Sequence, residues 1–118
     1  MGSVGNNSLP VLTISNNIIR YPDRENLYRD LNGSIQYYAY ENPMRKLGER
    51  NGVEYGIVGN KRTTNSRYNY TAGHIGYKID NGVVYITQFS PQTIAKATQF
   101  VKEDIKDDSK WIKLGRIK

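Results

Sequence analysis

Two Asn-Gly dipeptides, at Asn51-Gly52 and Asn81-Gly82, each separate two runs of residues that favour β-strands. Asparagine and glycine tolerate the positive φ angles of a tight turn, so an Asn-Gly pair between two such runs indicates a β-hairpin. The four strands predicted in this way cover residues 44–49, 53–58, 67–79 and 83–89. The centre of the chain is therefore expected to fold as antiparallel sheet.

A helix is expected before these hairpins. Asp23 is suited to cap a first helical turn, and apolar residues follow it at spacings of three and four. Asn32-Gly33 is a turn signal that conflicts with a long helix. The prediction is a helix over residues 23–31, followed by a tyrosine-rich strand over residues 34–41.

A second helix is expected after the hairpins, beginning at Ser90-Pro91, where serine can cap the first turn and proline fits within it. Its predicted buried stripe, at spacings of four, three and four, comprises Ile94, Thr98, Val101 and Ile105. Short strands are predicted at residues 11–14, with 18–19 as their continuation, and at 111–117.

Together these elements predict an α+β fold in a single domain spanning residues 1–118. It would contain a mostly antiparallel sheet of about five or six strands, with one helix before and one helix after the central hairpins. Residues 1–10 are expected to be an extended N-terminal segment, whose first three residues are either native or left over from cloning.

Composition restricts the chemistry. The 118 residues include no cysteine and one histidine, so we expect no disulfide, no structural metal and no cofactor. No apolar run is long enough for a membrane span. The net charge of +6 favours a polyanionic partner, with RNA preferred, although an anionic membrane or an acidic protein would also satisfy it. The alternative is a solvated surface with uneven charge.

Residues 59–78 hold four cations and no carboxylate. Cations bind phosphates, and hydroxyl and amide groups in a glycine- and asparagine-containing loop can add hydrogen bonds. The residues predicted to contact nucleic acid are Lys61, Arg62, Thr63, Thr64, Tyr68 and Lys78. Tyr68 is included because tyrosine rings stack on unpaired bases. The alternatives are a solvated connection between two strands, and tyrosines that serve cross-strand packing.

His74 is the candidate for proton transfer, because imidazole titrates near neutral pH. In a regular strand its side chain would share a polar face with Lys78, opposite an apolar face formed by Ile75 and Tyr77. Metal-independent RNA cleavage needs an acid and a base together with cations on the phosphate. The predicted catalytic residues are His74, Arg67 and Tyr70. The alternative is a structural histidine.

Val4-Gly5-Asn6-Asn7 resembles the Val-Glu-Asn-Asn junction that precedes the C-terminal toxin domains of contact-dependent and other polymorphic toxin systems. Three of the four junction residues match, and Gly5 stands where the family has glutamate. The resemblance implies a compact, cysteine-free ribonuclease that acts in the cytoplasm and is held in check by an acidic inhibitor or immunity protein. It transfers no catalytic residue by position.

The leading hypothesis is a small basic RNA-directed domain that acts as a metal-independent, toxin-type ribonuclease. The alternative is a non-enzymatic binding module, such as a phage-encoded inhibitor or a virion or assembly component, that uses the same basic and tyrosine-rich surface. His74 separates them, because only cleavage requires its imidazole.

Overall fold

The computed structural model of the protein describes residues 9–23, 26–29, 33, 35–38, 41–60, 73–87 and 94–117. Strands predominate in these parts. The strands are β1 (Val11–Ser15), β2 (Ile18–Arg20), β3 (Asn26–Arg29), β4 (Ile35–Tyr38), β5 (Glu41–Arg50), β6 (Val53–Asn60), β7 (Gly73–Asp80), β8 (Val83–Thr87) and β9 (Trp111–Ile117). Between β8 and β9 lie the helix α1 (Ile94–Asp104) and a short 3-10 helix (Asp108–Lys110).

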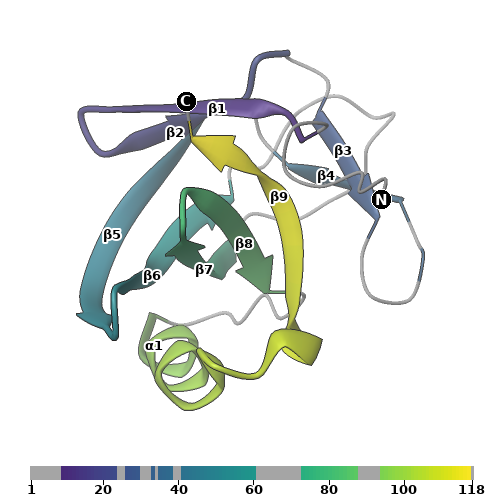
Figure 1. The fold of residues 1–118 in the computed structure, drawn as a ribbon. Helices are drawn as coiled ribbons and strands as arrows, with labels where there is room; N and C mark the ends of the chain where they lie inside the picture. The colour runs from purple at the N-terminus through teal and green to yellow at the C-terminus, as the bar shows by residue number, and fades with distance from the viewer. Residues whose placement is uncertain are drawn as a thin grey trace.

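Seven of the strands close into a barrel in the order β1-β2-β5-β6-β7-β8-β9 (Figure 1). Neighbouring strands are antiparallel except for β1 and β9, which close the barrel as a parallel pair through Val11–Arg116 and Leu12–Ile117. β3 and β4 form a separate two-stranded sheet. In Figure 1, α1 lies below the barrel wall that contains β6, β7 and β8.

The two hairpins predicted from Asn-Gly are confirmed. Asn51 and Gly52 have φ angles of 54° and 82°, and Asn81 and Gly82 have 53° and 78°. These turns join β5 to β6 and β7 to β8. A third turn of the same kind, at Asn16-Asn17 with φ angles of 53° and 59°, joins β1 to β2. Residues 18–19 are therefore not a continuation of the first strand but its hairpin partner.

The predicted α+β fold is wrong, because the sheet closes into a barrel and α1 is the only α-helix in the described part of the chain. The helix predicted over residues 23–31 is also wrong. β3 lies there instead and pairs with β4 from Asn26–Tyr38 to Arg29–Ile35. Arg29 Nη1 donates to the carbonyl oxygen of Gly33 at 2.8 Å, across a bend where Gly33 has a φ of 87°. Pairing between strands outweighed the weak helical spacing of this segment.

Two hydrophobic clusters stabilise the barrel, one on each side of its wall. The interior cluster comprises Leu12, Ile19, Tyr21, Val58, Ile75, Tyr77, Val84, Ile86 and Leu114. The exterior cluster lies between the wall and α1 and comprises Tyr55, Ile57, Val101, Ile105 and Trp111. The alternation in β6, with Val58 inside and Ile57 outside, shows that this strand contributes to both. Val101 and Ile105 confirm part of the predicted stripe of the second helix.

Tyr77 is the largest side chain that is fully buried in the interior. Its ring lies over Gly56, where an added Cβ would be 2.6 Å from Tyr77 Cε2 and would also meet the carbonyl oxygen of Arg45. The Tyr77 hydroxyl donates to Glu54 Oε2 at 2.8 Å. Burial, and secondly this carboxylate, raise the pKa of Tyr77 well above its usual value.

Gly56→Ala is expected to lower the free energy of unfolding by about 3 kcal/mol, because neither a barrel backbone nor a buried ring can move aside cheaply. Gly59→Ala, also in β6, is the matched control, since its Cβ would lie 3.3 Å from Pro43 Cγ and meet no backbone atom. Urea denaturation measures both. Equal losses in the two variants would contradict the close packing of Tyr77 on Gly56.

Tyr77 also predicts a loss of stability at alkaline pH. The folded-state pKa of Tyr77 is raised above the reference value of 10.0, so the folded protein retains a proton that the unfolded chain releases above pH 10. The stabilisation of the folded state by protonated Tyr77 is complete below pH 10. It decreases as the pH rises above 10, by at most roughly 1.4 kcal/mol per pH unit. Urea midpoints from pH 8 to 11 should therefore fall less steeply for Tyr77→Phe than for the wild type. Parallel curves would exclude this contribution.

Candidate nucleic-acid interface

The end of the barrel where β6 stops and β7 starts is where the predicted functional residues are attached. Gly59 pairs with His74, and Asn60 pairs with Gly73, so the two strands leave the barrel side by side. The connection between them holds most of the predicted site, and Lys61, Arg62, Thr63, Thr64, Arg67, Tyr68 and Tyr70 all lie outside the described residues. Their roles stay predictions.

His74 belongs to β7, in register with Gly59. The structure fixes its place in the strand, one residue after Gly73, and its side chain is outside the described part of the molecule. The apolar face predicted for this strand is confirmed, because Ile75 and Tyr77 both belong to the interior cluster. The opposite face differs from the prediction at Gly76 and Lys78.

α1 covers the face of β7 that was expected to be polar and open. A Cβ on Gly76 would collide with Val101 of α1 and lie 3.0 Å from Thr87 Cγ2. The backbone amide of Gly76 donates to Thr87 Oγ1 at 3.1 Å. Absence of a side chain at Gly76 thus lets the helix approach the wall closely. Only the first part of this face, around His74, remains as a candidate for ligand contact.

Lys78 lies beneath α1 and retains only 3% of its accessible surface. Its ammonium group donates to the carbonyl oxygen of Ile105 at 3.1 Å and to Asp108 Oδ1 at 2.9 Å. The Nζ atom also lies 5.0 Å from the ring centre of Tyr85 and 5.2 Å from that of Trp111, within the range of cation–π attraction. These contacts occupy the cation inside the protein, and they do not present it to a phosphate.

The contacts of Lys78 fasten the C-terminal end of α1, where the helix dipole is negative and the last carbonyl groups need donors. Trp111 assists, because its Nε1 donates to the carbonyl oxygen of Asp104 at 2.8 Å. The sequence contained one relevant signal, because a two-residue turn at Asn81-Gly82 places Tyr85 directly opposite Lys78. Nothing local indicated that Trp111, the first residue of β9, joins them.

Most of the exposed cations of the described residues form two groups, and Arg29 on β3 is separate from both. The group on β5 comprises Arg45, Lys46 and Arg50. The group on α1, β9 and the segment between them comprises Lys96, Lys102, Lys106, Lys110 and Lys113. The second group is interspersed with carboxylates at Glu103, Asp107 and Asp108. Of these, Asp107 accepts hydrogen bonds from the backbone and hydroxyl of Ser109, which lower the pKa of Asp107. These carboxylates therefore weaken the positive electrostatic potential of the second group of cations.

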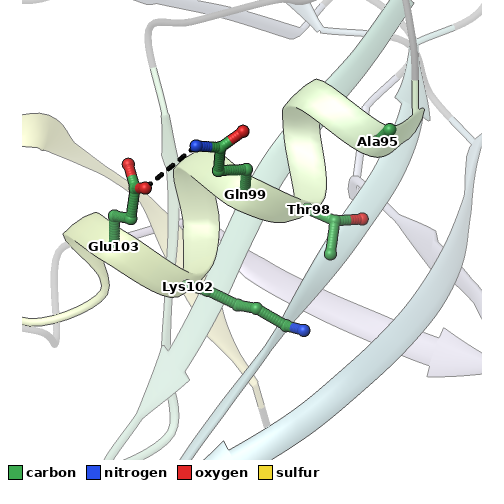
Figure 2. Close-up of a pocket in the computed structure, with 5 residues that line it drawn as sticks. All are labelled: Ala95, Thr98, Gln99, Lys102 and Glu103. Carbon is green, nitrogen blue, oxygen red and sulfur yellow. Dashed lines mark hydrogen bonds between the residues drawn. The ribbon is translucent and has the colours of Figure 1, made fainter.

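A shallow groove of about 490 Å³ runs along α1 and is lined by Ala95, Thr98, Gln99, Lys102 and Glu103 (Figure 2). Gln99 Nε2 donates to Glu103 Oε1 at 3.1 Å, whereas Lys102 extends from another side of the helix. The groove offers one cation and no histidine among these residues, which is little for catalysis. Within the described ranges, no three His, Asp or Glu side chains gather closely enough to hold a metal ion.

No family model, no curated protein and no solved structure matches this chain. The resemblance of residues 4–7 to the toxin junction therefore stays an expectation. Among the described segments, no helix has the length and apolar character needed to cross a bilayer.

Lys78→Met is expected to lower the free energy of unfolding by about 1.5–3 kcal/mol, because it removes charged hydrogen bonds to Ile105 and Asp108 while keeping the aliphatic stem. Lys113→Met, at an exposed position of β9, is the control and should change stability by less than about 0.5 kcal/mol. Equal unfolding midpoints for the two variants would show that Lys78 does not fasten α1.

Proposed function

We propose that this protein is a small basic RNA-directed domain that binds RNA at the end of the barrel where β6 stops and β7 starts. The pairing of Gly59 with His74 carries this proposal, because it attaches both ends of the segment 61–72 to adjacent strands of a rigid wall. That segment contains Lys61, Arg62 and Arg67 and no carboxylate. A cationic connection held on a scaffold is suited to a phosphate backbone.

The distribution of charge supports this end of the barrel. Asp104 is the last residue of α1, and Asp107 and Asp108 follow the helix. Lys78 contacts Asp108 near the far end of β7. Gly73 lies five positions before Lys78 in β7, which corresponds to roughly 16 Å at the usual rise per residue. Val101 meets Gly76 and Ile105 meets Lys78, so α1 runs in the direction of β7 and its positive end lies toward Gly73. The acidic groups are thus kept away from the proposed RNA surface.

His74 supports cleavage as the activity of this surface. It follows the cationic segment by two residues and is held in β7, while the residue opposite it, Gly59, has no side chain to crowd a ligand. An imidazole there can transfer a proton to or from RNA at neutral pH, with Arg67 on the phosphate and Tyr70 as a weak donor. The proposal is a metal-independent ribonuclease of the toxin type.

The second candidate is RNA binding without cleavage. It is favoured by the burial of Lys78, which takes one predicted phosphate contact out of the site and leaves less positive charge to stabilise a transition state. In this case the same surface holds RNA, and His74 contributes packing only.

The test uses fluorescent single-stranded RNA in chelator, with anisotropy at several salt concentrations for binding and gel analysis for cleavage. The plot of log affinity against log salt concentration has a negative slope, and Arg62→Ala/Arg67→Ala should reduce its magnitude by about 1.4. This is the amount expected when two phosphate contacts to a single strand are lost. Lys106→Ala/Lys113→Ala removes the same charge from another surface and should leave the slope unchanged. Equal slopes in all three proteins would refute the proposed RNA surface.

His74→Ala decides between the two candidates. The ribonuclease proposal expects loss of cleavage with RNA affinity retained within about twofold, because proton transfer and phosphate binding use different groups. Full cleavage by this variant would refute the proposed mechanism. An intact wild-type protein that binds RNA and never cleaves it would support the binding module.

A further inference from the structure

β5 is a long strand whose two edges differ. On one side β6 pairs with it from Met44 to Arg50. On the other side β2 pairs only with Glu41–Pro43, and the amide of Met44 donates to the carbonyl oxygen of Asn17 at 2.7 Å. Beyond that point no strand of the described chain lies beside β5, which forms an outer edge of the barrel in Figure 1.

The free edge covers residues 45–50, six residues or roughly 20 Å of strand. The free edge begins where the β1–β2 hairpin turns at Asn16-Asn17. Beyond this turn, none of the described strands lies next to residues 45–50 on that side of β5. Outward-facing amide and carbonyl groups on such an edge are a template for one more strand. The length is sufficient for an extended peptide of five or six residues.

The charged side chains along this edge of β5 indicate which kind of additional strand would bind there. Arg45, Lys46, Glu49 and Arg50 are all exposed, and the single carboxylate is already paired, with Lys46 Nζ 3.0 Å from Glu49 Oε2. Arg45 and Arg50 have no carboxylate within ion-pairing distance in the described part of the chain. A second copy of the protein would bring the same excess of cations, and each copy carries a net charge of +6. The complementary partner is acidic.

We propose that the free edge of β5 binds an extended acidic segment of a partner protein, which adds a strand beside residues 45–50. Backbone hydrogen bonds would supply affinity, and carboxylates opposite Arg45 and Arg50 would supply selectivity. The irregular register between Lys46 and Gly48 bends this edge and, with the cations, discourages pairing with neutral strands or with another copy. This inference uses a different strand from the RNA surface and does not depend on it.

The test uses a fluorescent eight-residue peptide of alternating glutamate and valine with blocked ends, followed by anisotropy and by amide chemical shifts of the protein. We expect the peptide to bind, to shift the amides of residues 45–50, and to bind at least tenfold more weakly to Arg45→Glu/Arg50→Glu. Lys106→Glu/Lys113→Glu makes the same change in net charge elsewhere and should bind like the wild type. The Arg45→Glu/Arg50→Glu protein should instead bind the corresponding lysine–valine peptide.

A second peptide, methylated on every backbone nitrogen, keeps the carboxylates and cannot donate backbone hydrogen bonds. It should bind at least tenfold more weakly than the parent peptide. Equal affinity of the two peptides, shifts confined to other strands, or no binding at all would overturn the proposal. Displacement of the peptide by single-stranded RNA, or dimerisation of the wild type through β5 in sedimentation, would assign this edge to another occupant and would equally overturn it.

Discussion

Burial of both faces of β7 is the constraint on which the rest of this structure depends. Ile75 and Tyr77 fill the barrel, while Gly76 and Lys78 lie beneath α1. A strand covered on both sides needs a second layer outside the sheet, and α1 supplies it. The helix can approach because Gly76 has no side chain, and the buried ammonium group is tolerated because carbonyl, carboxylate and aromatic groups surround it.

This arrangement gives the two ends of β7 different tasks. The end at Lys78 is fixed by α1 and surrounded by the carboxylates that follow the helix, so it is a structural junction. The end at Gly73 and His74 is paired with β6 and receives the cationic connection. The proposed RNA surface therefore occupies one end of a wall that is anchored at the other. The free edge of β5 is separate from both, so RNA and an acidic partner would use different parts of the same barrel.

Local sequence signals predicted much of this fold, but they did not predict that the sheet closes into a barrel. Asn51-Gly52 and Asn81-Gly82 specify their turns through backbone angles that few other residues adopt, so the two hairpins followed from sequence. The spacing of Val101 and Ile105 predicted the buried side of the second helix because residues three or four apart lie on one helical face. The prediction of a helix at residues 23–31 failed because the apolar spacing was given more weight than the turn signal at Asn32-Gly33, and β3 instead pairs with the next strand, β4. Lys78 was predicted to contact nucleic acid and is buried instead. Alternation along a strand indicates which residues share a face, and it does not indicate what covers that face.

The parallel pair that closes the barrel joins residues from opposite ends of the sequence, Leu12 in β1 and Ile117 in β9. Contacts so distant along a chain form late, because their loop entropy must be overcome before they contribute any stability. On the ribosome, β1, β2 and β5 to β8 can form an open sheet, and Leu12 has no neighbour from β9 until that strand has left the exit tunnel. The barrel can therefore close only after β9 has been made, and until then the edges of β1 and β8 that pair with β9 stay without a partner strand.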